Sequence, residues 1–485
     1  MEQMLLDLSK FFHYSLEKPW FFTEYGFLLT LALFLLGYAF FKPKSTWKLA
    51  YLIVFSLFFY YKSSGPFLLL FVGVITFDYI LALWIYRLEG IKRKIAIGLT
   101  VVYSLSFLLY FKYSNFVIEN LNTLFGTDFS QKNLFLPIGI SFYTFQSVSY
   151  LIDVYRKEIK PSKQLLEYGF YMTFFPHLVA GPIVRAKDFL PQIQNPISFN
   201  PLLLKEALLR IVTGLLKKLL IADFLGKYVD MIHQTPQGFS GLEHTLSMYA
   251  YSFQIYFDFS GYSDIAIGIA LILGYRMKEN FFNPYTAQNI VDFWRKWHIS
   301  LSLWLRDYIY IPLGGNRKGQ LKMYLFLFIT MTVGGIWHGA DWRFVFWGCA
   351  HGLLLILNKL WFKPVAKPKS IQRIVGIILT FHLVGFLWIF FRAATIESAF
   401  QSITIIATRT NPMDILAFAY ARPEVIALLL VSITLVFMPW NLKQKVIHSI
   451  LSLPLSLWPI ILLIALQLIV QFRDSNIEPF IYFQF

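Results

Sequence analysis

The sequence is poor in charged residues and almost devoid of cysteine. Only 14% of its 485 residues are charged, whereas 57% are hydrophobic. Soluble domains contain about 25% charged residues, so this composition excludes an ordinary water-soluble enzyme, a disordered protein and a coiled coil. The single cysteine, Cys349, cannot form an internal disulfide, and the Cys/His spacing of a zinc ribbon does not occur. We therefore expect no metal site.

Acidic residues are scarcer than basic ones, with 27 Asp and Glu against 43 Lys and Arg and a formal net charge of +16. In a soluble chain this excess would suggest nucleic acid. Here the basic residues form short clusters between apolar runs, which is typical of a membrane protein, and we expect no nucleic-acid partner. The clusters around Lys42, Arg93 and Lys157 alternate with loops of little positive charge. This alternation predicts that the three clusters are cytoplasmic and that the N-terminus lies outside.

Apolar runs of spanning or near-spanning length follow one another along the chain, and several are interrupted by Gly and Pro. A straight span needs about 20 residues, so the shorter runs predict tilted or re-entrant helices buried in protein. We expect an all-α polytopic membrane protein with roughly 10–13 membrane-embedded helices. The runs are Tyr25–Phe41, Leu49–Tyr61, Pro66–Tyr86, Ile95–Phe111, Leu134–Val154, Leu165–Val179, Leu202–Phe224, Ser247–Leu273, Lys322–Trp337, Phe344–Trp361, Ile371–Phe391, Glu424–Trp440 and Leu451–Phe472.

The chain divides into three regions by the polar residues within its apolar runs. Residues 1–133 and 362–485 consist of simple spans, whereas residues 134–361 combine polar and small residues with apolar ones. Ionisable groups at membrane depth are costly and are usually functional. We therefore predict that the functional site lies in residues 134–361.

The most prominent polar motif is GGIWHGADW, residues Gly334–Trp342. Glycines on both sides of His338 allow another backbone or a substrate to come close. Desolvation disfavours an imidazolium, so we expect a neutral His338 that can accept a proton. The alternative is a histidine that only packs helices together. The neighbouring Trp337 is a candidate for substrate binding.

A second motif, DFWRKWHISLSLWLRDY, begins at Asp292 and contains His298. Read as one helix, it places Trp294, Trp297 and His298 on the same face. Asp292 and Lys296 have the spacing of an i,i+4 ion pair. The alternative is an amphipathic anchor at the membrane surface with an incidental histidine.

A third motif, QIYFDFSGYSD, places Asp258 and Asp264 inside an apolar run. An unpaired carboxylate there would cost several kcal/mol or be protonated. We expect structural pairing with basic residues of the second motif, with substrate binding as the rival role. The candidate counter-charges are Arg295, Lys296 and Arg306.

A fourth motif, PHLVAGPIVR, marks an unwound stretch at a membrane edge because it contains two prolines and a glycine. Its terminal Arg185 is a candidate for binding a phosphate or carboxylate. His177 in the same stretch is expected to be a structural partner rather than a catalyst.

Together these residues resemble the membrane-bound O-acyltransferase family, and within it the bacterial branch that acetylates alginate and other exopolysaccharides. The resemblance covers about Leu136 to Gly352. It rests on LPIGISFYTFQ (Leu136–Gln146), FFPHLVAGPIVR (Phe174–Arg185), QIYFDFSGYSDIAIG (Gln254–Gly268), NFFNPY (Asn280–Tyr285), DFWRKWHISLSLWLRDYIYIPLGG (Asp292–Gly315) and GGIWHG (Gly334–Gly339).

The resemblance implies helices around a central funnel or tunnel through the bacterial inner membrane. It implies His338 as the main catalytic residue and His298 as an assisting one near the cytoplasmic mouth. The donor would be an acyl thioester, either acyl-CoA or an acyl carrier protein, with no tightly bound cofactor. The acceptor would be a polysaccharide, reached directly or through an extracytoplasmic SGNH-type acetyl-transfer partner. The predicted substrate-binding residues are Asp258, Asp264, Arg295, Lys296, Trp297, Trp337 and Arg185.

Two other functions stay open at the level of sequence. One keeps the family and changes the reaction to D-alanyl transfer, or to acyl transfer to a lipid or protein. The other is a transporter without chemistry, with a midplane site at Asp258 and Asp264. Transporters often contain paired broken segments from an internal duplication, and no convincing duplication occurs here, which counts against a transporter.

Overall fold

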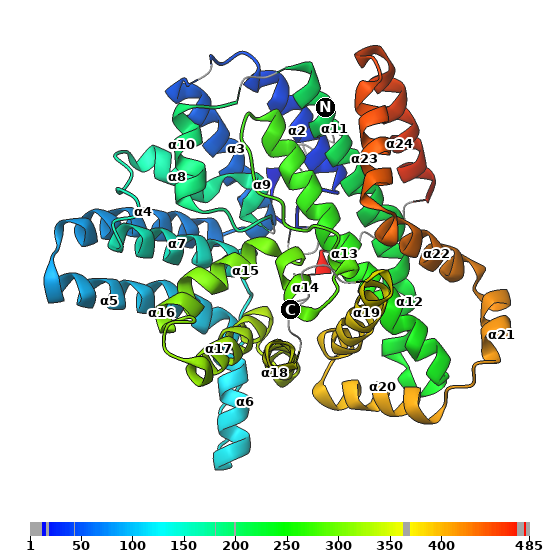
Figure 1. Ribbon diagram of the computed structural model, residues 1–485. Helices are drawn as coiled ribbons and strands as arrows, with labels where there is room; N and C mark the ends of the chain where they lie inside the picture. The colour runs from blue at the N-terminus through cyan, green and yellow to red at the C-terminus, as the bar shows by residue number, and fades with distance from the viewer. Residues whose placement is uncertain are drawn as a thin grey trace. The chain divides into compact units, whose positions relative to one another are not determined.

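Helices joined by loops make up the part of the chain that the structure describes, which confirms the all-α prediction. The structure is a computed structural model, and no strand occurs among the residues that it describes. Figure 1 shows the helices coloured along the chain. The described residues are 12–15, 19–42, 44–179, 181–197, 200–361, 369–472 and 480–481.

The contacts between residues divide the chain into two compact units. The first unit comprises Met1–Ala207 and Ala266–Lys278, and the second comprises Leu208–Ile265 and Glu279–Phe485. Helices α11 (Pro201–Leu216) and α13 (Gly241–Ile272) contribute residues to both units. The three-region division by polar content stays a prediction.

The first unit is built from the N-terminal helices and a long buried segment after them. In it α4 and α5 each pack against α7, and α3 packs against α8. Its helices are α2 (Tyr25–Tyr38), α3 (Thr46–Ser64), α4 (Phe67–Arg87), α5 (Gly90–Leu108), the π-helix η1 (Leu109–Tyr113), α6 (Ser114–Phe125), α7 (Ile140–Tyr155), α8 (Leu165–Thr173), α9 (Phe175–Leu178) and α10 (Ala186–Gln194).

The second unit contains both histidine motifs. Its helices up to the second histidine motif are the π-helix η2 (Lys217–Ala222), α12 (Asp223–Gln234), η3 (Pro236–Gly238), η4 (Pro284–Thr286), α14 (Ile290–Lys296), α15 (Ile299–Leu305), the π-helix η5 (Arg306–Tyr310) and α16 (Ile311–Leu313). The remaining ones are α17 (Gln320–His338), α18 (Trp342–Trp361), α19 (Ser370–Arg392), α20 (Ile396–Thr408), α21 (Asp414–Ala421), α22 (Pro423–Phe437), α23 (Trp440–Ser452), η6 (Leu455–Leu457) and α24 (Trp458–Phe472).

Seven helices within the described residues are long and apolar enough to cross a membrane. An eighth span is possible if α21 and α22, which are bent by 100° at their junction, form one broken span. The prediction of a multi-pass membrane protein is therefore confirmed. The seven are Phe67–Arg87, Gly90–Phe125, Gly241–Ile272, Gln320–His338, Trp342–Trp361, Ser370–Arg392 and Leu455–Phe472.

Several of the other predicted runs fold as short or broken helices, whereas Leu49–Tyr61 lies within the unbroken 19-residue helix α3. Leu165–Val179 divides into α8 and α9 because Pro176 cannot donate a backbone hydrogen bond within a continuing helix. Pro454 likewise separates α23 from η6 and α24. Backbone breaks of this kind at membrane depth must be satisfied by surrounding protein. The funnel through the membrane stays a prediction.

The membrane helices differ in how much of their surface the protein covers. In α13, 89% of the most apolar window is buried, whereas only 17% is buried in the span that contains α24. Large apolar side chains such as Leu463 and Ile464 are more than half exposed. Such surfaces suit lipid tails, and α13 is therefore an interior helix that can carry polar groups.

Candidate active site

Helices α17 and α18 pack closely because glycines line their contact. They form the side-by-side pair labelled in Figure 1. A Cβ atom on Gly348 would lie 2.6 Å from the carbonyl oxygen of Met331 and 3.0 Å from the Cα atom of Gly335. Small residues of this kind let membrane helices approach along their backbones. The expected close approach of another backbone beside the GGIWHG motif is thus confirmed.

His338 is the last residue of α17 and is only 4% exposed. Gly339 follows with an extended backbone, so the chain leaves the helix directly after the imidazole. Three aromatic rings surround that imidazole: the centroids of Trp337, Trp347 and Phe391 lie 5.0, 5.2 and 5.1 Å from it. His338 therefore occupies a dry, aromatic environment inside the second unit.

The second histidine lies at a break between helices, and the prediction of one continuous helix through it is wrong. Helix α14 ends at Lys296, and α15 begins at Ile299. His298 between them has φ of 40°, in the left-handed region. A non-glycine residue there is strained and persists only where its surroundings hold it. Trp294, Trp297 and His298 consequently do not share one helical face.

Asn280 holds His298 in place. The Nδ1 atom of His298 lies 3.2 Å from Asn280 Oδ1, which also accepts a 2.8 Å hydrogen bond from the Ser300 hydroxyl. Because that amide oxygen only accepts, His298 donates through Nδ1, and Nε2 is the basic nitrogen of the neutral ring. Burial lowers the pKa of His298 to about 3, which keeps the ring neutral. Sequence reasoning missed Asn280, although it belongs to the NFFNPY motif.

Trp337 connects the two predicted catalytic histidines. Its ring centroid lies 5.0 Å from that of His338 and 6.2 Å from that of His298. The structure therefore brings together two motifs that are 40 positions apart in the sequence (338 − 298 = 40). The candidate active site is this cluster of His298, Trp337 and His338.

A third histidine, His351, belongs to the same aromatic cluster and was missed by sequence reasoning. It is fully buried, and its Nδ1 atom accepts a 3.3 Å hydrogen bond from the Trp294 indole. The ring of Trp347 contacts both His351, at 4.5 Å, and His338, at 5.2 Å. A signal existed in the sequence, because His351 follows Gly348 by three positions and shares its helical face.

Trp297 lies next to this cluster rather than in contact with His338. It is 1% exposed, and its ring contacts Trp388 at 5.0 Å. Trp388 in turn stacks on Trp347 at 5.6 Å. Trp297 is therefore linked through Trp388 to the aromatic rings around His338. Its role in substrate binding stays a prediction.

Asp258 is paired as expected, but the predicted partners are wrong. Lys218 Nζ lies 2.6 Å from Asp258 Oδ1 and 2.7 Å from Asp223 Oδ1, and all three side chains are buried. Lys218 belongs to the π-helix η2, whose i→i+5 hydrogen bonds widen the turn and shift side chains relative to an α-helix. The predicted partners, Arg295, Lys296 and Arg306, were favoured only because they stand in a charged motif. The residue that reaches the Asp258 carboxylate is instead a lysine within an apolar run.

Asp264 is also paired by residues from the same stretch. Lys217 Nζ lies 2.5 Å from Asp264 Oδ2, and Arg210 Nη1 lies 3.6 Å from Asp264 Oδ1. The pairing favours a structural role for both aspartates, and their predicted substrate binding stays untested. A basic pair inside an apolar run, Lys217 and Lys218, was the sequence signal for these partners.

The predicted Asp292–Lys296 ion pair is confirmed, with a distance of 2.9 Å. Both side chains are partly exposed, and Arg295 beside them is exposed. Arg306 pairs with its neighbour Asp307 at 2.6 Å. Arg295 and Arg306 are therefore exposed on the second unit, and Lys296 is partly exposed.

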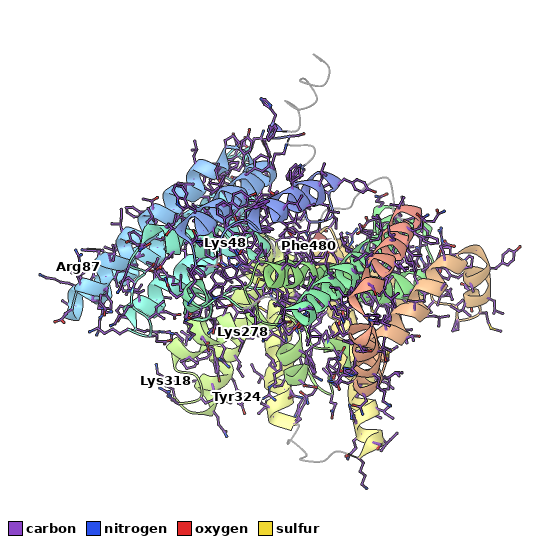
Figure 2. All side chains as sticks on the ribbon, turned by 90° about the horizontal axis from the view of Figure 1, so that it is seen from above. Lys48, Arg87, Lys278, Lys318, Tyr324 and Phe480 are labelled. Carbon is purple, nitrogen blue, oxygen red and sulfur yellow. The ribbon has the colours of Figure 1, made fainter. Side chains whose placement is uncertain are left out.

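The end of the chain contributes an aromatic residue near His298. Phe480, labelled in Figure 2, stacks on Tyr262 at 4.8 Å and contacts Phe259 at 5.2 Å. The Ile481 backbone N–H donates to Asp258 Oδ2 at 2.8 Å. Phe259 meets the His298 ring edge-on at 4.6 Å. One aromatic layer therefore separates Phe480 from His298.

The comparison with known families identifies what this cluster belongs to. A model of the membrane-bound O-acyltransferase family matches residues 53–400, which include both histidine motifs. The chain belongs to the membrane-bound O-acyltransferase family. The resemblance drawn from the sequence motifs is therefore confirmed.

Several curated relatives are similar over most of the chain. A probable alginate O-acetylase of Pseudomonas aeruginosa is 42% identical over 358 residues, covering 72% of this chain and 68% of that protein. A peptidoglycan O-acetyltransferase of Helicobacter pylori is 36% identical over 379 residues, covering 72% of each chain. A teichoic acid D-alanyltransferase of Bacillus subtilis is 31% identical over 271 residues, covering 52% of this chain and 68% of that protein.

This membership makes the chain a multi-pass membrane O-acyltransferase and argues against a transporter without chemistry.

Two residues of the fourth motif belong to the first unit. Arg185 is 9% exposed and precedes α10, and its predicted anion binding stays a prediction. His177 lies 2.9 Å from the carbonyl oxygen of Tyr171, which agrees with its expected structural role.

Proposed function

We propose that this O-acyltransferase moves an acetyl group from a cytoplasmic thioester to hydroxyls of an extracytoplasmic polysaccharide such as alginate. The transfer is direct or passes through an extracytoplasmic SGNH-type partner. The proposal draws support from relatives named for O-acetylation of alginate and of peptidoglycan. It places the protein in the bacterial inner membrane, where a cytoplasmic donor and an external acceptor are both in reach.

The observation that carries the proposal is the position of His338. A buried imidazole at the end of α17, between glycines and aromatic rings, suits a general base. The imidazole takes the proton of the acceptor hydroxyl, whose oxygen attacks the thioester carbonyl carbon. The tetrahedral intermediate then expels the thiolate, which receives the proton from His338. The C–S bond is broken, a C–O bond is formed, and the proton count balances.

His298 assists in this proposal rather than acting as the base. Its hydrogen bond with Asn280 fixes the ring orientation and directs Nε2 away from that bond. A neutral nitrogen near Trp337 can orient a substrate group beside His338. A route through an acyl-imidazole on His338 is the alternative mechanism, because histidine also serves as a nucleophile.

The donor is proposed to be acyl-CoA or an acyl carrier protein, with no tightly bound cofactor. Arg295, Lys296 and Arg306 are placed at the surface of the unit that contains the histidines. Cationic side chains of this kind attract phosphate groups or an acidic carrier. Trp297 and Trp337, which belong to the aromatic rings around the two histidines, are proposed to contact the substrates.

A second candidate reaction is D-alanyl transfer to teichoic acid. It is favoured by the Bacillus subtilis relative, which is 31% identical but covers only 52% of this chain. The acetylating relatives match a larger share of the chain at higher identity. Acetyl transfer is therefore the better supported reaction.

The proposal is tested by mass analysis of secreted and wall glycans from cells that carry the gene, lack it or carry His338→Ala. We expect acetylated glycan only with the unmodified gene, at equal membrane levels of protein. His382→Ala is the matched control, because that histidine is exposed on α19. Glycans that gain D-alanine instead of acetyl, or that do not change on deletion, would overturn the proposal.

A further inference from the structure

The first unit contains a cavity that the proposed reaction does not use. Its volume is about 780 Å³, which falls in the range of small-molecule sites. The end of α2, the start of α3, α8, α10 and the segment after α13 form its walls, and all of these residues belong to the first unit. The cavity is therefore a property of one compact unit.

Two lysines give one wall of this cavity its positive charge. Lys44 lies in the turn before α3, and Lys48 lies in the first turn of that helix. In the part of the chain that the structure describes, neither lysine forms an ion pair; Lys48 Nζ instead lies 3.9 Å above the ring of Tyr38. Lys48 is labelled in Figure 2. Two uncompensated cations beside an opening favour an anionic ligand group.

Another wall carries a single carboxylate. Glu167, at the start of α8, accepts hydrogen bonds from Gln194 at 2.7 Å and from Ser162 at 3.2 Å. Gln194 and Glu167 both line the cavity. This pairing holds the carboxylate in a fixed position, where a ligand ammonium group would be favoured over a second anion.

The remaining lining is apolar, with Leu35, Leu49 and Ile197 among its residues. Two aromatic side chains close to the lysines are strongly exposed, Phe40 at 89% and Trp47 at 76%. Aromatic side chains next to lysines are typical of the membrane–water interface. The cavity therefore combines an apolar part, a cationic part and one carboxylate at a place suited to lipid headgroups.

We propose that this cavity binds the headgroup of a zwitterionic phospholipid that carries a phosphate and an ammonium group. Lys44 and Lys48 bind the phosphate, Glu167 attracts the ammonium, and the apolar lining covers the glycerol and first acyl carbons. Free phosphate lacks the apolar part and would leave most of the volume unfilled. A lipid bound here holds α2, α3 and α8 together at the membrane surface.

The test is native mass spectrometry of the purified full-length protein with added phosphatidylethanolamine, phosphatidylglycerol or inorganic phosphate. We expect phosphatidylethanolamine to bind most tightly and inorganic phosphate not to displace it. Lys44→Ala with Lys48→Ala should weaken this binding about 30-fold, because each lysine near a lipid headgroup contributes about a fivefold effect. Glu167→Gln should remove the preference for phosphatidylethanolamine over phosphatidylglycerol.

The matched control is Lys42→Ala with Lys160→Ala, which removes the same charge from two lysines outside the cavity lining. Its lipid binding should equal that of the unmodified protein. Equal binding by the cavity variant and this control would overturn the proposal, as would displacement of the lipid by inorganic phosphate. Thermal unfolding of each variant checks that the fold is kept. Lipid binding is measured without acyl transfer. The lipid-site proposal can therefore be overturned while the proposed reaction stands, and the reverse also holds.

Discussion

Lysines in the two units have opposite surroundings. Lys218 in the second unit is buried between Asp258 and Asp223, whereas Lys44 and Lys48 in the first unit line a cavity without an ion pair among the described residues. Burial of an ammonium group is costly unless it is paired and hydrogen-bonded. The paired lysine therefore supports the fold around α13, and the unpaired ones are available to a ligand.

The largest effect is expected from breaking the buried triad. Lys218→Met leaves two buried carboxylates without their counter-charge, which should lower the free energy of unfolding by about 3–5 kcal/mol. Thermal unfolding in detergent measures the change. A triple variant that also carries Asp258→Asn and Asp223→Asn should recover most of the loss, since no buried charge remains. If Lys218→Met alone were as stable as the unmodified protein, the triad would not stabilise the fold.

A smaller effect is expected where the glycine contact positions His338. Gly348→Ala places a methyl group 2.6 Å from the Met331 carbonyl oxygen, so α17 and α18 must separate. We expect a loss of stability of about 1–3 kcal/mol and a fall in acyl transfer. Gly98→Ala in α5 is the control, because its added Cβ would meet no other part of the described protein within 4 Å. Equal activity of the two variants would contradict the proposed positioning by this contact.

Acid should destabilise the protein through His298. Burial lowers the pKa of His298 to about 3, whereas in the unfolded chain it is about 6.5. Between these values the unfolded chain binds a proton that the folded protein does not bind. Stability should therefore decrease as the pH falls below about 6.5, by about 1.4 kcal/mol per pH unit from this group.

The pH effect is measured by unfolding the unmodified protein and His298→Asn between pH 7 and pH 5. Asparagine tolerates the left-handed backbone and has no proton to bind in this range. The slope of stability against pH should be shallower in the variant by about 1.4 kcal/mol per unit. Identical slopes would mean that His298 is not a buried neutral group.

The smallest effect is expected at the surface pair Lys296–Asp292. Both partners are partly exposed, so Lys296→Ala should change stability by less than about 1 kcal/mol. If Lys296 attracts the donor phosphates, the KM for the thioester should rise while kcat stays similar. An unchanged KM would remove Lys296 from the donor site and leave the pair as a surface contact only.

The sequence predicted the helical membrane fold and the close backbone approach beside the His338 motif, because apolar runs and glycine-flanked polar motifs are local signals. The catalytic role of His338 stays a prediction. The contact of His298 and His338 with Trp337 could not be predicted, since it depends on tertiary packing between motifs 40 positions apart (338 − 298 = 40). The helix break at His298 was missed because helical periodicity continues through it. It is held by Asn280, which is distant from it in the sequence.

The counter-charges of Asp258 and Asp264 were wrongly predicted for a related reason. A charged motif was assumed to supply the partners, but the π-helix η2 turns Lys217 and Lys218 toward the carboxylates. Neither the position of a π-helix nor the path of α13 follows from composition. The lysines and aspartates within apolar runs could be recognised in the sequence. Which lysine pairs with which aspartate follows only from the structure.

Single-turnover kinetics can decide whether His338 is the base in acyl transfer. The purified protein in lipid nanodiscs is mixed with an acetyl thioester and a polysaccharide acceptor, and ester formation is followed for the unmodified protein and for His338→Ala. If His338 is the base, ester formation should be slower by about 10²–10⁴-fold with His338→Ala and unchanged with His382→Ala. Ester formation at the unmodified rate by the His338→Ala protein would contradict that role.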